Sequence, residues 1–281
     1  MQIALAELND GVNPCSARIF DDITITQDAS VVRVTAEVRE YLGVSLEEQA
    51  RWRNGDEALK NWRARVEDKG VFVFKDPFKQ ENISGFSLLH EQFPVIYLNN
   101  RTAKTRQIFS LFHELFHLLQ GTSGIAKTDD AYMDLLQGEA RRTEVLCNLL
   151  AGEFLVPSHD FRRFLSEDFH DEGVVQSIAS EYSVSREVVL RKALSEELID
   201  RGYYERKAAE WTEQYKARRG SGSGGNYYAN QAAYLGERFL SLAFGRYYQG
   251  RCTAEQLADY LGVRARNLAG LEPFALRREA P

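Results

Sequence analysis

Residues 108–119 constrain the fold more than any other part of the sequence, because ionisable residues interrupt a largely apolar run. These residues are His113, Glu114 and His117, and they form the motif H-E-x-x-H. On an α-helix, residues four positions apart lie only about 40° apart around the axis. Both imidazoles then project from one face, one turn apart, as a tetrahedral zinc ion requires. We therefore predict a helix that carries two zinc ligands, His113 and His117.

The same helix carries an apolar stripe on another face. Its members are Ile108, Leu111, Phe112, Leu115 and Leu119. We expect this stripe to be buried in the core, and the two histidines to face a cleft on the other side of the helix. Glu114 lies about 100° around the axis from His113, so it reaches water at the metal without ligating the metal. We predict Glu114 as the catalytic general base.

A third ligand is needed, because a catalytic zinc site has three protein ligands and one open position. The next long predicted helix covers residues 138–155 and ends before Pro157. Glu144 stands at the amino-terminal end of its apolar stripe, where a carboxylate can point inward. Helix geometry alone leaves Glu139 and Glu153 as alternatives to Glu144.

Composition excludes several other classes of protein. The 281 residues include only three cysteines, which excludes a disulfide framework and a zinc module built from cysteines. No apolar stretch reaches 18 residues and no secretory signal is visible, so we expect a cytoplasmic protein that does not bind membranes. A net charge of -6 makes direct nucleic-acid binding the weaker expectation.

The hydrophobic pattern predicts an α+β fold with a small antiparallel sheet, active-site helices and mostly helical C-terminal regions. The predicted strands are 71–74, 83–89 and 94–98. The predicted helices are 56–69, 102–120, 138–155, 159–165, 172–182, 186–194, 200–219, 227–249 and 253–271. We divide the chain into a lead-in (1–54), a metallopeptidase domain (55–165), a region resembling a helix-turn-helix (166–219), a Gly/Ser linker (220–225) and a C-terminal helical region (226–281).

Three segments of the chain together resemble the ImmA/IrrE family of zinc metallo-endopeptidases. They are residues 70–73 with 94–99, residues 109–118, and residues 144–151 continuing to 154–157. The family's third segment reads E-x-x-A-N-x-(F/L)-A, and its first Glu is a zinc ligand. The resemblance therefore implies Glu144 as the third ligand. It covers residues 55–165 strongly and the tail from Asn226 to Val263 more weakly.

The resemblance also implies a zincin-like domain and a class of substrate. Family members cleave helix-turn-helix repressors, which relieves repression of stress-response, mobile-element or defence genes. We expect an extended substrate to pair with strand 94–98 as an edge. Tyr132 and His159 are the alternatives for stabilising the oxyanion.

The sequence departs from the family pattern at two positions. Phe116 stands where the family has a small residue, and we expect it to narrow the cleft between the ligands. Cys147 replaces an alanine one turn from Glu144. A thiol there is either an inhibitory ligand or oxidation sensor, or a small buried apolar group, and we favour the buried group.

Two stretches, 178–185 and 257–263, read like helix-turn-helix sequences. The basic residues that follow the turns are candidates for phosphate contacts, and they are Arg186, Arg191, Lys192, Arg264 and Arg266. A second hypothesis is therefore a DNA-binding or toxin–antitoxin-type regulator, whose peptidase domain serves sensing or partner binding. The alternative for these helices is that they pack on the peptidase domain or bind a protein partner, and we favour it.

Overall fold

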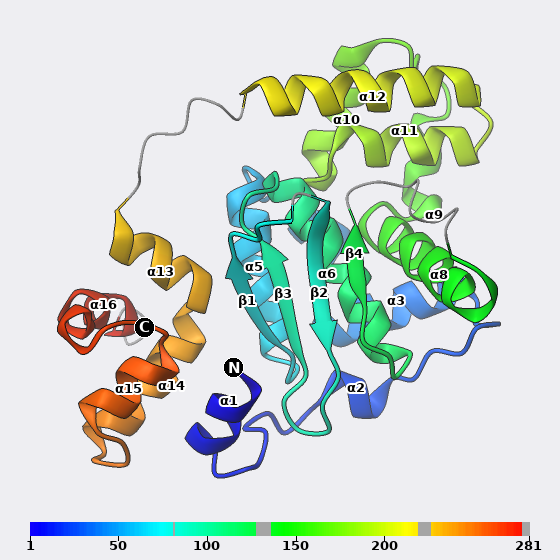
Figure 1. Cartoon of the computed structure of the whole chain (residues 1–281). Coiled ribbons are helices and arrows are strands. Elements are labelled where there is room, and N and C mark those ends of the chain that lie inside the picture. Colours follow the sequence, from blue (N-terminus) through cyan, green and yellow to red (C-terminus); the bar gives the residue numbers. More distant parts are fainter. Residues whose placement is uncertain (81, 128–135, 219–225, 277–281) are drawn as a thin grey trace.

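The structure is a computed structural model that describes residues 1–80, 82–127, 136–218 and 226–276. The chain begins with helices α1 (Gln2–Leu8), α2 (Ile19–Asp22), α3 (Val31–Leu42), α4 (Leu46–Ala50) and α5 (Gly55–Glu67). Strands β1 (Phe72–Asp76), β2 (Ile83–Leu88) and β3 (Val95–Asn99) follow, and then α6 (Lys104–Leu119), β4 (Ile125–Lys127) and α8 (Gly138–Leu155). The next elements are α9 (Ser158–Phe161), η1 (Arg162–Phe164), α10 (Glu172–Tyr182), α11 (Arg186–Ser195) and α12 (Arg201–Arg218). The last are α13 (Tyr227–Leu235), α14 (Glu237–Tyr248), α15 (Ala254–Tyr260), η3 (Ala265–Asn267) and α16 (Leu268–Ala275). A small sheet among many helices is the α+β class that the sequence predicts (Figure 1).

The ends of α6 and α8 lie where glycine or proline marks a helix stop in the sequence, but the C-terminal helices differ from the prediction. α8 has the predicted limits, and Gly121 takes a left-handed φ of 68° after α6. The predicted helical tail has two breaks, because Gly236 separates α13 from α14 with a φ of 88° and Gly262, with a φ of 62°, follows α15. Few residues other than glycine adopt such a φ, so the breaks are encoded locally.

The sheet is mixed, not wholly antiparallel as predicted from the sequence. Its strand order is β1-β3-β2-β4, with β1 parallel to β3 and the other pairs antiparallel. The reason is that β3 lies between β1 and β2, although it follows both in the chain. β3 is therefore interior, and the prediction that strand 94–98 is an edge was wrong. In the described part of the chain, the edges of the sheet are β1 and β4.

The two faces of the sheet belong to two hydrophobic cores. Val73, Ile96 and Leu98 are buried in a core shared with α3, α5, α6, α8 and α10–α12. Phe72 and Phe74 alternate with Val73 and are buried on the opposite face, against α1 and the C-terminal helices. This alternation follows the period of two of a β-strand, so the sheet separates the two cores.

Aromatic packing sets the relative position of α5, α6 and α8. The Trp62 ring of α5 meets Phe112 of α6 edge to face, with centroids 4.8 Å apart. Phe154 of α8 lies 4.1 Å from Phe112 and 5.2 Å from Trp62. These large, fully buried side chains have few alternative arrangements in a close-packed core. They bring α6 and α8 together where each carries predicted ligands.

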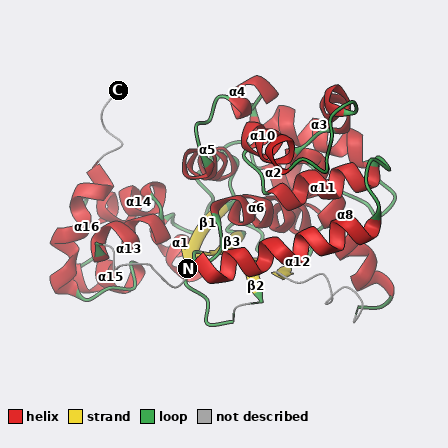
Figure 2. Cartoon of the chain, turned by 90° about the horizontal axis from the view of Figure 1, so that it is seen from above, coloured by secondary structure: helices red, strands yellow, loops and turns green. Residues whose placement is uncertain are grey.

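The helices α13–α16 gather at one end of the molecule, beside β1 (Figures 1 and 2). Phe239 of α14 contacts Phe74 of β1, with ring centroids 5.3 Å apart. The predicted linker 220–225 lies outside the described residues, and the domain boundaries stay a prediction. Among the described residues, no helix has both the length and the hydropathy of a membrane-spanning segment.

Candidate metal centre

Three side chains that the sequence nominates as zinc ligands converge between α6 and α8. The Nε2 atoms of His113 and His117 lie 3.1 Å apart. One carboxylate oxygen of Glu144 lies 3.2 Å from His113 Nε2, and the other lies 3.3 Å from His117 Nε2. The structure therefore brings together two neighbouring helical turns of α6 and one residue of α8, separated by 27 positions or more in the chain.

The outer hydrogen bonds of the two imidazoles determine which ring nitrogen carries a proton. His113 Nδ1 lies 3.1 Å from the side-chain oxygen of Asn148, which can only accept. His117 Nδ1 lies 3.3 Å from the Thr122 hydroxyl, whose own proton is donated to the His117 carbonyl at 3.0 Å. Both Nδ1 atoms are therefore donors, and both neutral rings direct an Nε2 lone pair inward.

These atoms fit a zinc ion. Ligand atoms about 2.0–2.1 Å from a tetrahedral zinc ion lie about 3.3 Å from one another. The distance between the two Nε2 atoms is close to this value, and so is the distance from each Nε2 to its nearer Glu144 oxygen. Two lone pairs and a carboxylate that face one another without a shared proton repel, and a cation removes this repulsion. A pocket of about 330 Å³ borders His117 and Glu144 and leaves a side of the cluster open. The donor set and the open side suit a catalytic metal rather than a closed structural one.

Glu114 lies beside this cluster but points toward the sheet. One carboxylate oxygen accepts a hydrogen bond from the Ser87 hydroxyl of β2 at 2.7 Å. The other accepts from the backbone N–H of Ala126 in β4 at 2.6 Å. Ser87 is itself oriented by the N–H of Gly124 at 2.9 Å. The side chain is fully buried, so these two bonds hold a carboxylate in a fixed direction.

Gly124 makes the close approach of β4 to the cluster possible. A Cβ atom at this position would lie 2.4 Å from His117 Cδ2 and 2.7 Å from a carboxylate oxygen of Glu114. Both distances are shorter than van der Waals contact, so no other residue fits without displacing a site residue. Sequence reasoning missed Gly124, Ser87 and Thr122, because none belongs to a local motif. A role for Asn148 could have been predicted from the sequence, because Asn148 follows Glu144 by four residues and so lies on the same face of α8.

The charge environment keeps Glu144 ionised and Cys147 protonated. Burial tends to raise the pKa of Glu144, but where His113 or His117 carries a proton on Nε2, its hydrogen bond and charge lower that pKa to about 2. Burial, followed by the negative charges of Glu144 and Glu114, raises the pKa of the Cys147 thiol well above its usual value. The Cys147 sulfur accepts a hydrogen bond from Gln120 at 2.9 Å. This environment favours Cys147 as a buried small group, not as a thiolate ligand.

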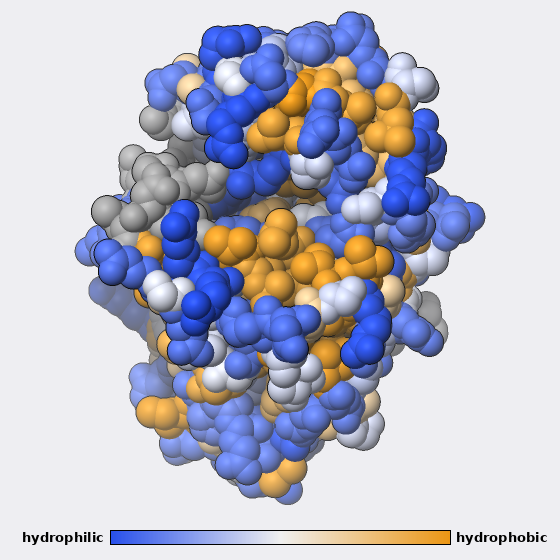
Figure 3. Space-filling model, turned by 90° about the vertical axis from the view of Figure 1, so that its right-hand side faces the viewer, coloured by the Kyte–Doolittle hydropathy of each residue, from blue (hydrophilic) through white to orange (hydrophobic). Residues whose placement is uncertain are grey.

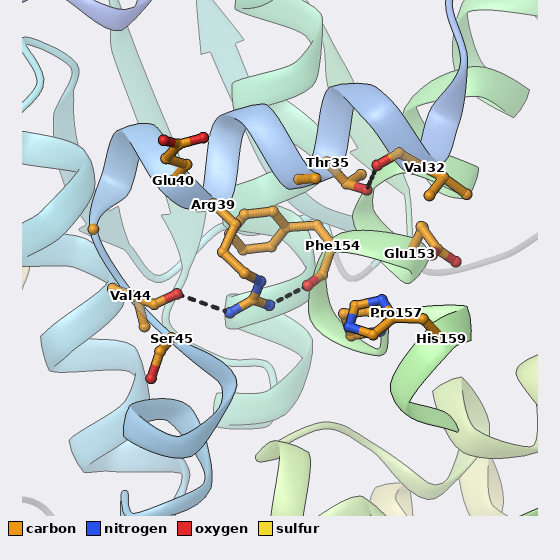
Figure 4. Close-up of a pocket in the computed structure, with 12 residues that line it drawn as sticks. Val32, Thr35, Arg39, Glu40, Val44, Ser45, Glu153, Phe154, Pro157 and His159 are labelled. Carbon is orange, nitrogen blue, oxygen red and sulfur yellow. Dashed lines mark hydrogen bonds between the residues drawn. The ribbon is translucent and has the colours of Figure 1, made fainter. Parts of the chain in front are cut away.

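The alternative ligands and one oxyanion candidate lie elsewhere. Glu139 lines the 330 Å³ pocket as an exposed residue, and Glu153 is bound by Lys192 and Ser158. His159 lines a different pocket with Arg39, whose guanidinium donates to the carbonyls of Val44 and Phe154 (Figure 4). Tyr132 lies outside the described residues. Helix geometry in the sequence did not decide whether Glu139, Glu144 or Glu153 is the third metal ligand. Of the three, only Glu144 contacts the histidines.

Two expectations for α6 need correction. The predicted apolar stripe is buried in the core and His117 lines a pocket, but no side of the helix is open to solvent along residues 110–119, and His113 and His117 are only 3% and 2% exposed. The reason is that α5 and α8 cover one side and the sheet covers the other. Phe116 does not narrow the cleft, because its ring is fully buried in the core and meets Phe154 at a centroid distance of 6.2 Å.

The first helix-turn-helix stretch corresponds to α10 and α11, but its basic residues have partners within the chain. Arg186 pairs with Glu172 at 3.0 Å and lies over the Trp211 ring at 4.3 Å. Lys192 contacts Glu153 and Ser158. Cations held in this way are poorly placed for phosphate contacts, which favours packing on the peptidase domain. In the second stretch, Arg264 and Arg266 are exposed.

Comparison with known proteins agrees with the geometry. A search of curated proteins found no match for the chain. Residues 66–194 match the sequence model of the IrrE N-terminal-like domain, peptidase family M78. The matched range contains β1 to α11, and so every residue of the cluster described above. The chain therefore contains a segment, residues 66–194, that is similar to the IrrE N-terminal-like domain of a metallopeptidase family.

Proposed function

We propose that this protein is a zinc-dependent endopeptidase that cleaves a helix-turn-helix transcriptional repressor, and so relieves repression of stress-response, mobile-element or defence genes. One observation carries the zinc assignment: the lone pairs of His113 and His117 meet the Glu144 carboxylate with tetrahedral spacing. The repressor substrate rests on the resemblance to the ImmA/IrrE family. The match of residues 66–194 to a peptidase family supports the peptidase activity.

In this proposal His113, His117 and Glu144 hold the ion. When bound, zinc is a Lewis acid that polarises the scissile carbonyl and lowers the pKa of the attacking water. The Glu114 carboxylate accepts the proton of that water and delivers it to the leaving nitrogen. Its bonds to Ser87 and Ala126 orient it for both transfers, because they leave it no freedom to rotate.

The edge of the sheet suits an extended polypeptide. In the described part of the chain β4 pairs with β2 alone, so its other side can add a substrate strand. Ala126 of β4 bonds to Glu114, which places that edge beside the proposed base. Val145 and Leu149 of α8 are exposed, and apolar areas lie near the centre of the face viewed from the α8 side (Figure 3). Exposed apolar surface of this kind suits a protein substrate.

The test is a Glu114→Gln variant, with Glu139→Gln as the matched control in the neighbouring pocket. We expect Glu114→Gln to retain zinc, measured by elemental analysis, and to lose about 10²- to 10⁴-fold in cleavage rate. Glu139→Gln should cleave at the wild-type rate. The substrates are any helix-turn-helix protein encoded by a neighbouring reading frame and a denatured, alkylated polypeptide, with fragments identified by mass spectrometry.

The outcomes separate the two parts of the proposal. Undiminished cleavage by Glu114→Gln would show that the mechanism is wrong. Cleavage of the denatured polypeptide but not of the repressor would keep the peptidase and overturn the repressor as its substrate.

A further inference from the structure

Another cavity lies at the opposite edge of the sheet from the metal centre, between α5, β1 and the C-terminal helices α13 and α14. Its volume is about 410 Å³, within the range of small-molecule pockets. One wall is apolar and is made by small side chains and one ring. These are Ala64, Ala229, Ala232, Ala233 and Phe274.

The other walls of this cavity carry charges, and almost all of them are paired. The pairs that line it are Lys60 with Glu237 at 3.2 Å, Arg63 with Glu67 at 2.9 Å, and Arg238 with Asp68 at 2.8 Å. Asp56 also lines the cavity and pairs with Lys104 at 3.3 Å. Each pair is neutral, so this set contributes no excess charge to the cavity.

Lys75 of β1 is the exception. It lines the cavity and is partly buried, and within the described residues it has no hydrogen bond or ion pair. Burial, followed by the positive charges of Arg63 and Lys104, lowers the pKa of Lys75 to about 7, against the opposing effect of Asp56 and Glu67. A partly buried cation without a counter-ion has lost some of its hydration, and a bound anion would offset that loss.

The walls of the cavity are fixed relative to one another, because Arg63 of α5 hydrogen-bonds both to β1 and to the end of α13. Its guanidinium donates to the carbonyl of Val73 in β1 and to the carbonyls of Ala233 and Leu235 at the end of α13. Gly236 lies so close that a Cβ there would be 2.1 Å from the Arg63 side chain. A ligand in the cavity would therefore contact both the peptidase sheet and the C-terminal helices.

We propose that this cavity binds a small organic anion, with a carboxylate that pairs with Lys75 and an apolar part that lies against the alanines of α13 and Phe274. A single unpaired cation matches a single negative charge. The apolar wall excludes a ligand that is polar throughout, because its polar groups would lose their hydration without gaining partners. Neither the metal cluster nor Glu114 takes part in this site.

The experiment is calorimetric titration of the full-length chain with hexanoate, and with 1-hexanol as the uncharged analogue. The variant is Lys75→Met, which keeps the length of the side chain and removes the charge. The control is Lys79→Met, because Lys79 is an exposed lysine just after β1 that does not line the cavity. Thermal unfolding checks that each variant is folded.

We expect saturable binding of one hexanoate per chain, weakened about tenfold or more in Lys75→Met and unchanged in Lys79→Met. Hexanol should bind more weakly than hexanoate, and hexanoate affinity should fall as the pH rises above about 7, where the amine loses its proton. Equal hexanoate affinity in wild type and folded Lys75→Met would overturn the proposal. Absence of saturable binding to the wild-type chain at millimolar hexanoate would overturn it too.

Discussion

The two edges of one sheet have opposite chemical character. Beside β4, two imidazole lone pairs and a carboxylate converge without a proton between them. Beside β1, the Lys75 ammonium has no acceptor among the described residues. Both sites contain buried polar groups that the chain itself does not satisfy, and each such group costs free energy. The sign of the unsatisfied group therefore indicates the ligand: a cation at β4 and an anion at β1.

The two sites also differ in how they are held. At the metal centre, Trp62, Phe112 and Phe154 position the ligand-bearing helices, and hydrogen bonds orient His113, Glu114 and His117. At the β1 cavity, Arg63 makes the bonds that link the two walls, and Lys75 itself is not oriented by any partner in the described residues. Substitutions at the first site should therefore have larger effects than those at the second.

The largest effect should come from Glu144→Gln, because it removes the negative charge from the proposed ligand set. We expect zinc affinity to fall by roughly 100-fold or more, measured by competition with a chromophoric chelator. Glu139→Gln, on the same helix, should leave the affinity unchanged. Equal zinc affinity in Glu144→Gln and wild type would show that Glu144 is not a zinc ligand, and the contrast between the two edges of the sheet would then fail at β4.

Gly124→Ala should be the next most severe change. The added Cβ would be forced against His117 and Glu114, and overpacking of this kind costs about 3 kcal/mol or more. We expect lower stability in chemical denaturation and loss of cleavage. Gly152→Ala is the control, because a Cβ there meets nothing within 4 Å and alanine favours the helix. If both variants behave alike, the close approach of β4 does not limit the site.

Asn148→Leu should have a moderate effect, because it removes the acceptor for His113 Nδ1–H. We expect zinc affinity to fall about 10- to 100-fold, as for other partners of metal-ligating histidines. Asn148→Asp should retain the affinity, since a carboxylate also accepts that proton. Competition titration of both variants distinguishes an orienting hydrogen bond from a simple packing role.

The smallest effect concerns the pH dependence of stability at the β1 cavity. Lys75 has a pKa of about 7 in the folded chain, below its value of about 10.4 when unfolded. Between these values the unfolded state binds more protons, so the free energy of unfolding contributed by Lys75 rises with pH. Lys75→Met should therefore be stabilised relative to wild type below pH 7, with the difference shrinking as the pH rises. Denaturant titrations at several pH values measure it, and a constant difference would contradict the assignment.

The sequence predicted the elements that depend on local pattern. The limits of α8 were predicted correctly, and α6 contains the predicted motif, because helical periodicity and stop signals act within a few residues. The breaks of the helical tail at Gly236 and Gly262 were not predicted, although a glycine marks each of them. The sheet was predicted less well, because the parallel pairing of β1 with β3 depends on residues more than twenty positions apart.

By itself, the sequence determined the helix that presents His113, Glu114 and His117, because four-residue spacing on a helix is a local property. Only the tertiary structure decided which carboxylate meets the histidines, and which hydrogen bonds orient them. It also decided that β4 is the edge beside the site, and that Lys75 faces a cavity without a counter-ion. The physical reason is that strand order and charge pairing arise from contacts between distant segments, whose relative positions only the packed core determines.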